Sequence, residues 1–407
     1  MNRNLYLIFA AMFWLFVAQT SAFVLIPLIA SAIGLRGGAI GLLVAMPAGL
    51  GLATDVLAAT TSDRIGRKPL ILVGAIVGVA SGTHLAIASD FTALFIDSVG
   101  LGLSLSFTLG PVLAYVTEAS LPEDAARIQG YLGGVQGSSM LLAALAIGFS
   151  IDRLGTQPSS ALVAIPMALA FLAVTAVEES VTRGRARSAR ELIATYGVAL
   201  GFLLRRPQLQ ISALNSLIYT MVVFIVGTSF LPIYIVRDLS LPGVLVGILI
   251  ATRNAALTIA SPFFGYVVRR RGFVQTLLGA NAASVIGLFG LALVPDWRWL
   301  YVPLALAGFG AGFGAASSNL LVASATARYE RALGFAANSL MGRAGGLVLP
   351  VVFGAILGLW GSHGVFVAAG LLGVVILILI VLVVRNGYQE DGNGFRPTSP
   401  LALRPYD

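Results

Sequence analysis

Long apolar runs separated by short polar loops extend from the start of the chain to about residue 384. Twelve of these runs are long enough to cross a hydrocarbon core of about 30 Å as α-helices. They cover residues 5–29, 38–61, 69–89, 91–116, 129–151, 158–177, 208–235, 242–267, 273–294, 300–325, 333–358 and 363–384. The alternating ten-residue segments of a membrane β-barrel do not occur in the sequence. The pattern therefore predicts an all-α polytopic membrane protein with twelve transmembrane helices.

A polar segment divides the spans into two groups of six. This linker, residues 179–206, separates an N-terminal bundle at 1–178 from a C-terminal bundle at 207–385. Within the linker, residues 189–206 carry apolar side chains at helical spacing between basic ends, which predicts an amphipathic helix on the membrane surface. The polar residues 386–407, which include Gly and Pro, predict a disordered tail.

Composition and charge add an orientation to this picture. Hydrophobic residues make up 58% of the chain and charged residues only 10%, against about 25% charged in a soluble domain. Nineteen of the 25 Lys and Arg residues fall on one side of the predicted membrane, and four on the other. By the positive-inside rule the basic side is cytoplasmic, and it holds both termini. We expect a monomer in a plasma membrane, the inner membrane of a bacterium, with the lipid bilayer rather than nucleic acid as the partner of the basic charge.

One dense polar cluster, residues 59–70 ("ATTSDRIGRKPL"), follows the second span. Gly66 permits a sharp turn with positive φ between two antiparallel helices. Pro69 suits the first turn of the next helix, where no amide donor is needed. Asp63, at the inner end of the second span, can meet the positive N-terminus of another helix.

The twelve spans, the central linker and this cluster together resemble the major facilitator superfamily, from about residue 5 to residue 384. The family signature after the second helix reads Gly-x-x-x-Asp-Arg/Lys-x-Gly-Arg/Lys-Arg/Lys. Its matching residues here are Asp63, Arg64, Gly66, Arg67 and Lys68, while Ala59 replaces the leading glycine. A degenerate copy, "GYVVRRRGF" at 265–273, has Arg269 in the place of the acid. The resemblance implies two pseudo-symmetric six-helix bundles with a substrate site between them.

The resemblance also implies a conformational latch in this cluster. Asp63 would contact the N-terminus of the eleventh helix, in the opposite half, when the protein opens outward. Arg67 would bridge toward Glu118 at the end of the fourth helix. The alternative is a charged turn that only satisfies the membrane topology.

Drug–proton antiporters of this family usually carry Arg-x-x-x-Gly-x-Gly in the fourth helix. The corresponding stretch here is "IDSVGLG", with Ile96 in the arginine position and Asp97 beside it. The fifth-helix pattern that ends in Gly-Pro is reduced to "GGVQGSS" at 133–139. Other segments, such as "GRAGGLVLPVVFG" at 342–354, resemble bacterial efflux-type members.

Four charged residues lie inside predicted spans, where a charge costs roughly 2.5–3.5 kcal/mol on insertion scales. They are Arg253, Arg343, Asp97 and Asp55. In a functional interpretation the arginines hold an anionic group in a central cavity, and Asp97 or Asp55 takes up the coupling proton. In a structural interpretation the arginines pair with buried acids or backbone carbonyls and fix the helix packing. Weaker candidates for the cavity wall are Asn215, Tyr219, Asn319 and Asn338, and His84 is interpreted as a packed residue.

The sequence offers no basis for an enzyme, a metal site or a cofactor. It contains no cysteine, only two histidines far apart, and no phosphate-binding loop that ends in Gly-Lys-Ser/Thr. We therefore expect transport that draws on an ion gradient. The preferred function is proton-coupled efflux of a small organic solute. The alternatives are proton-linked uptake or exchange of an organic anion and, in another class, a transport-inactive receptor or scaffold.

Overall fold

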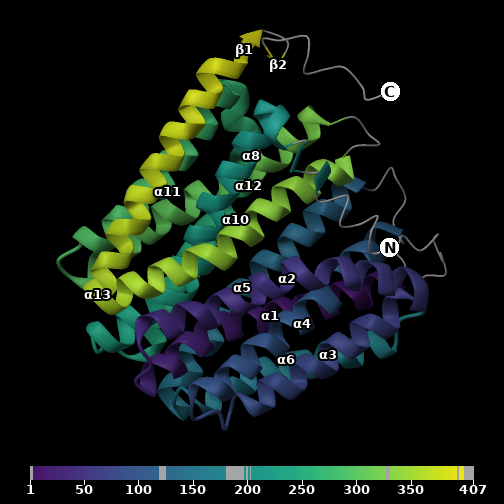
Figure 1. Cartoon of the computed structure of the whole chain (residues 1–407), viewed down its shortest axis with the longest axis vertical. Helices are drawn as coiled ribbons and strands as arrows, with labels where there is room; N and C mark the ends of the chain where they lie inside the picture. The colour runs from purple at the N-terminus through teal and green to yellow at the C-terminus, as the bar shows by residue number, and fades with distance from the viewer. Residues whose placement is uncertain are drawn as a thin grey trace.

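The computed structural model describes residues 3–118, 125–179, 197–198, 200–201, 203–326, 331–391 and 394–397. The described chain is almost entirely helical and forms two groups of helices (Figure 1). The first group contains α1 (Arg3–Ala32), α2 (Gly37–Ile65), α3 (Arg67–His84), α4 (Phe91–Glu118), α5 (Ala125–Leu154), the short η2 (Pro158–Ser160) and α6 (Ala161–Thr175). The second contains α8 (Pro207–Thr220), η3 (Met221–Phe230), α9 (Leu231–Ile233), η4 (Tyr234–Asp238), α10 (Gly243–Arg271), α11 (Phe273–Leu293), η5 (Trp297–Trp299), α12 (Tyr301–Ala325) and α13 (Arg331–Gly387).

These helices confirm the all-α prediction. Ten helices among the described residues are long and apolar enough to cross a membrane. The predicted number is twelve because α13 contains two predicted spans, joined where Gly361 leaves helical geometry at φ 67° and ψ −170°. The remaining predicted span coincides with α3, which has only 18 residues and carries Arg67, Lys68 and His84 at its ends.

The seventh predicted span has a backbone feature that the apolar pattern does not reveal. From Pro207 to Asp238 the helix is continuous, but η3 and η4 have the wider hydrogen-bonding pattern of a π-helix. Such segments are rare and frequently occur at functional sites.

The two halves share one hydrophobic core at one end of the molecule and have separate cores at the other. We call the end where α2, α10 and α13 finish the basic end, because Arg64, Arg269–Arg271 and Arg385 lie there. At the opposite end a single cluster contains Leu25 and Ile40 of the first half together with Phe230 and Val246 of the second. Figure 1 shows the two groups meeting near the bend in α13 and diverging toward the side of both termini.

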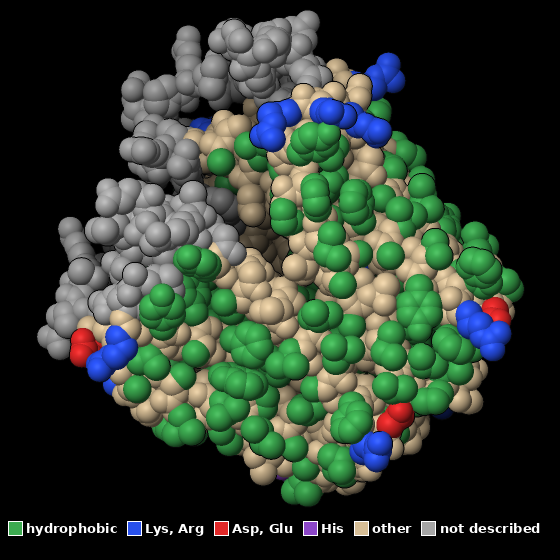
Figure 2. All heavy atoms as spheres, turned by 180° about the vertical axis from the view of Figure 1, so that it is seen from behind, with side chains coloured by type: hydrophobic (Ala, Val, Ile, Leu, Met, Phe, Trp, Pro, Cys, Tyr) green, Lys and Arg blue, Asp and Glu red, His purple; other side chains and the backbone are tan. Residues whose placement is uncertain are grey.

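Apolar side chains cover the face seen in Figure 2, and charged side chains gather at its margins. Exposed large hydrophobic residues include Ile96, Phe149 and Leu371. Apolar area this extensive on an outer surface indicates contact with lipid. The protein is therefore a multi-pass membrane protein.

The linker and tail are only partly described. The described linker residues 197–198, 200–201 and 203–205 are helical, and most of the predicted amphipathic helix lies outside the described residues. Where we expected a disordered tail, α13 continues to Gly387 and β1 (Tyr388–Asp391) pairs antiparallel with β2 (Gly394–Pro397).

Candidate functional site: a cavity between the two halves

A cavity of about 290 Å³ lies between the two halves. Helices α1, α2 and α4 form one wall, and α8 and α13 form the other. Its lining residues are Gln19, Phe23, Val44, Pro47, Ala48, Leu105, Leu109, Ser216, Tyr219, Thr220, Asn338, Ser339, Gly342, Arg343, Gly346 and Pro350. Side chains of the first half are mainly apolar, and those of the second half mainly polar, so the cavity is amphipathic.

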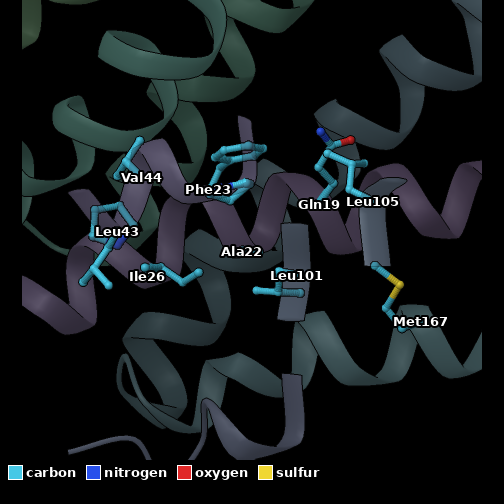
Figure 3. Close-up of a pocket in the computed structure, with 11 residues that line it drawn as sticks. Gln19, Ala22, Phe23, Ile26, Leu43, Val44, Leu101, Leu105 and Met167 are labelled. Carbon is cyan, nitrogen blue, oxygen red and sulfur yellow. The ribbon is translucent and has the colours of Figure 1, made fainter. Parts of the chain in front are cut away.

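An apolar recess extends this cavity into the first half (Figure 3). Its walls come from α1, α2, α4 and α6, and it shares Gln19, Phe23, Val44, Pro47 and Leu105 with the larger cavity. The other lining residues are Ala22, Ile26, Pro27, Leu43, Leu101 and Met167. With a volume of about 30 Å³, the recess has room for an apolar group no larger than about a methyl group of a solute bound in the cavity.

Two predicted residues from opposite halves form an ion pair at this cavity. Nη2 of Arg343 on α13 contacts Oδ2 of Asp55 on α2, and the side chains are only 23% and 27% exposed. Gly51, one turn before Asp55, makes room for the pair, because a Cβ at that position would overlap the guanidinium of Arg343. The sequence predicted both charges as separate candidates, and the structure brings them together across the interface. Gly51 was not predicted, since its role depends on a side chain from the other half.

A hydrogen-bonded cluster forms the polar wall beside Arg343. Oδ1 of Asn338 accepts hydrogen bonds from the hydroxyls of Ser212, at 2.9 Å, and Ser216, at 2.6 Å. Asn338 and Tyr219, both candidates for the cavity wall, line this cavity. Asn215 is buried, and its amide donates to the carbonyl of Gly314 and the hydroxyl of Ser318, both at 2.7 Å, so it joins α8 to α12.

Asn319 lines a second cavity of about 470 Å³, between α5, α10 and α12. Tyr219 lines both cavities. Tyr219 therefore marks the place where the two spaces approach each other along α8. Ser261 and Thr258 add hydroxyl groups to this second wall.

Arg253 is completely buried in the second half. Its guanidinium donates to the carbonyls of Val222, at 3.3 Å, and Val223, at 2.8 Å, both in the π-helical segment η3. It also donates to the hydroxyl of Thr228 and to Oδ1 of Asn254. This geometry favours the structural interpretation, in which the arginine satisfies backbone carbonyls and fixes the packing of α10 against η3.

Asp97 is paired with His84 rather than with a group in the central cavity. Its Oδ1 lies 2.8 Å from Nδ1 of His84, and the Asp97 side chain is 1% exposed. The second oxygen, Oδ2, is buried and has no hydrogen-bond partner among the described residues. The pair joins the end of α3 to α4, so His84 is more than a packing residue.

The polar cluster after α2 forms the expected turn. Gly66 has φ 106° between α2 and α3. The amides of Arg67 and Lys68 donate to the carboxylate of Glu179 at 2.9 and 3.1 Å, and Nζ of Lys68 donates to the carbonyls of Thr175 and Val177 at the C-terminal end of α6. Glu179 thus caps the N-terminus of α3, a role not predicted because we assigned that acid to the linker.

The two acids of the predicted latch cannot be placed in the same way. The side chains of Asp63 and Glu118 lie outside the described residues. Arg64 is exposed, and the guanidinium of Arg67 donates to the hydroxyl of Ser62. The contact between Asp63 and the eleventh helix therefore stays a prediction.

Two helical halves around a shared cavity, with an ion pair inside the membrane, define a membrane transporter. The chain belongs to the Major Facilitator Superfamily, whose family model matches residues 8–252 and 212–405. The likeness predicted from residues 59–70 is thus confirmed across the chain.

The curated relatives are bacterial resistance proteins. Quinolone resistance protein NorA of Staphylococcus aureus is 25% identical over 142 residues, which is 35% of this chain and 37% of NorA. Multidrug resistance protein 2 of Bacillus subtilis is 26% identical over 138 residues, which is 33% of this chain and 34% of that protein. The chain spans about a third of the length of these curated relatives.

Solved transporters share the fold over almost the whole chain. A crystal structure of a nucleoside transporter NupG mutant has a TM-score of 0.77 at 14% identity, covering 94% of this chain and 100% of that one. A bacterial homologue of the human lysosomal transporter Spinster, in an inward-facing and unoccupied conformation, has a TM-score of 0.71 at 16% identity and covers 94% and 96%. At these identities the likeness concerns the fold alone.

Proposed function

We propose that the protein is a secondary transporter that exports a small organic solute in exchange for protons, by alternating access. The observation that carries the proposal is the Asp55–Arg343 ion pair, which joins the two halves at the wall of their shared cavity. Transporters of this architecture bind substrate between their repeats and move by rocking one against the other. A titratable pair at that interface can link a proton to the movement.

The coupling follows from the charges of this pair. A proton on the carboxylate of Asp55 removes the partner of Arg343 and leaves a mostly buried guanidinium uncompensated. Loss of one partner of this partly buried pair costs about 2 kcal/mol, between the values for exposed and buried pairs, so the protonated state favours a rearrangement of the interface. When the carboxylate has released its proton, Ser216, Asn338 and Arg343 offer hydrogen-bond donors and acceptors to a polar group of the solute, while the apolar side chains around Phe23 contact its apolar part. Proton and solute thus occupy the site in turn, as exchange requires.

The separation of the halves supports alternating access. They share a core at one end and have their own cores at the basic end. With the basic end in the cytoplasm, as the positive-inside rule expects, this arrangement is an inward-facing state. The proposal accordingly places the protein in the bacterial inner membrane with both termini in the cytoplasm.

The direction of transport rests on the relatives. NorA and Multidrug resistance protein 2 are named for resistance to quinolones and to multiple drugs. We extend this to the present chain as efflux of an organic solute, with a quinolone as the first probe.

The experiment uses purified protein in liposomes with an imposed pH gradient and a pH-sensitive dye. Addition of a quinolone should start a proton flux across the membrane of liposomes that contain wild-type protein. Asp55→Asn and Arg343→Gln should abolish this flux. Arg298→Gln is the matched control, because Arg298 is exposed and lies outside the cavity. Proton flux that requires the quinolone but is unchanged in Asp55→Asn would contradict the coupling role.

Proton-linked uptake or exchange of an organic anion is the second candidate, and the place of Arg343 in the cavity wall favours it. Benzoate in the same assay separates the two candidates. Benzoate-dependent flux that Arg343→Gln abolishes, without any response to the quinolone, would establish the anion transporter. Absence of flux across a wider panel of solutes would favour a receptor or scaffold.

A further inference from the structure

The first half contains a second copy of the family signature, at the end of the molecule opposite the basic end. Residues 148–155, "GFSIDRLG", contain Gly148, Asp152, Arg153 and Gly155 and reproduce Gly-x-x-x-Asp-Arg-x-Gly. They include the leading glycine that the copy at the end of α2 lacks. Because α1–α3 and α4–α6 correspond to the inverted three-helix repeats of this architecture, α5 is the counterpart of α2, pointing the other way.

The acid of this copy caps a helix of the opposite half. Oδ1 of Asp152 accepts a hydrogen bond from the amide of Gly243 at 2.5 Å, and Oδ2 accepts one from the amide of Val244 at 3.1 Å. These are the first two residues of α10, and the preceding Pro242 gives the helix no side-chain cap. A carboxylate is favourable at a helix N-terminus because it satisfies free amides and compensates the positive end of the helix dipole.

The packing around Asp152 requires the two backbones to approach closely. A Cβ at Gly148 would lie 2.8 Å from the Cα of Gly247 on α10, and a Cβ at Gly243 would lie 2.5 Å from the Cγ2 of Ile151. Gly155 turns the chain out of α5 with φ 89°, as Gly66 does after α2 with φ 106°. The glycines of the second copy therefore serve the same contact as its acid.

We propose that Asp152 is the latch that closes the end opposite the basic end, as the counterpart of the latch predicted at Asp63. The inference rests on the proposed alternating-access function and goes beyond it by naming the group that holds this gate. Since Asp152 belongs to one half and α10 to the other, the cap exists only while this end is closed. The separation of α5 from α10 that outward opening requires must break both hydrogen bonds. The copy at Asp152 thus stabilises the inward-facing state, and the copy at Asp63 the outward-facing state. The difference between these two stabilisations sets the resting conformation.

Asp296 provides a matched control for this contact. It also lies at the end opposite the basic end and accepts a hydrogen bond from a helix amide, that of Arg298, at 3.0 Å. Both groups belong to the second half, so this cap is the same in every relative position of the halves. Asp296→Asn should therefore leave the conformational balance unchanged.

The test measures distances between spin labels on pairs of introduced cysteines, which are unique because the chain contains none. Leu154→Cys with Leu293→Cys reports on the end that carries Asp152, and Ile65→Cys with Tyr266→Cys reports on the basic end. All four side chains are exposed, and each pair joins the two halves. In Asp152→Asn the ratio of long to short distances at the first pair should rise about two- to fivefold, the effect of removing a negative charge from a helix N-terminus, and the second pair should close.

Unchanged distributions in Asp152→Asn would overturn the latch, as would the same shift in Asp296→Asn. If Asp152→Asn does not yield folded protein, Asp152→Glu keeps the charge on a longer side chain, and it should shift the ratio in the same direction by a smaller factor. An unshifted ratio in that variant would equally overturn the proposal. The distance measurement needs no substrate, so a shift without any transport would contradict the proposed function and leave the latch intact.

Discussion

Gly51→Ala tests the geometry of the central ion pair without removing either charge. Gly51 is buried on α2, and an added Cβ would overlap the guanidinium of Arg343 and lie 2.6 Å from its Cζ. The guanidinium must move, and its contact with Asp55 breaks. We expect lower stability and loss of proton-coupled flux from this single methyl group.

The magnitude follows from two opposing effects. Alanine is favoured over glycine in a helix interior by about 1 kcal/mol. Breaking a pair whose members are 23% and 27% exposed falls between an exposed pair, at about 1 kcal/mol, and a buried one, at about 3–5 kcal/mol. With about 2 kcal/mol for the pair, the net change is a destabilisation of about 1 kcal/mol. Gly279→Ala on α11, where nothing lies within 4 Å of an added Cβ, should instead stabilise by about 1 kcal/mol.

Thermal unfolding of the purified protein in detergent shows whether each variant is stabilised or destabilised, and the liposome assay measures its proton flux. In an Arg343→Gln background the shorter side chain removes the overlap, so Gly51→Ala should become stabilising. A Gly51→Ala protein as stable as Gly279→Ala and with wild-type flux would refute the placement of the guanidinium over Gly51.

Three further predictions follow from single contacts. Arg253→Met should destabilise the protein by about 1–3 kcal/mol in thermal unfolding, because the carbonyls of Val222 and Val223 lose their guanidinium donor; an unchanged midpoint would contradict the structural role. Glu179→Ala should cost about 1 kcal/mol by removing the cap of α3, and an unchanged unfolding midpoint would show that water replaces that carboxylate. Asp97→Asn should retain quinolone-dependent proton flux in liposomes, since Asp97 is paired with His84 away from the central cavity; loss of flux in a folded variant would make Asp97 the proton carrier.

The fold could be predicted from the sequence because lipid requires long apolar helices and short polar turns. The break between the last two spans was predicted at residues 359–362, and the bend falls at Gly361. The π-helical segments from Met221 to Phe230 and from Tyr234 to Asp238 were not predicted. Apolar periodicity does not distinguish them, and the guanidinium of Arg253, which hydrogen-bonds to carbonyls of the first segment, comes from another helix.

The sequence predicted the individual charged residues of the candidate site, but not which of them contact each other. Asp55 and Arg343 were recognised because isolated charges are costly inside a membrane. Their partnership could not be predicted, since it joins helices from opposite halves of the chain. Arg253 carries the same charge but is bound to backbone carbonyls, and only the three-dimensional packing separates the two arginines.

The same limit explains why Asp152 was not singled out. Its residue types match the family signature, but its counterpart at Gly243 lies 91 residues away in the other half. The helix end that the acid caps has no distinctive side chain of its own. The contact becomes recognisable only when α5 and α10 are seen side by side.

The measurement that tests the central claim most directly compares two modes of transport in Asp55→Asn proteoliposomes. Accumulation of a radiolabelled quinolone driven by a pH gradient requires the titrating carboxylate, whereas exchange of labelled for unlabelled quinolone at equal pH requires only the cavity and the movement of the halves. We predict that Asp55→Asn abolishes gradient-driven accumulation and retains exchange. Gradient-driven accumulation at the wild-type rate in Asp55→Asn would contradict proton coupling through the Asp55–Arg343 pair.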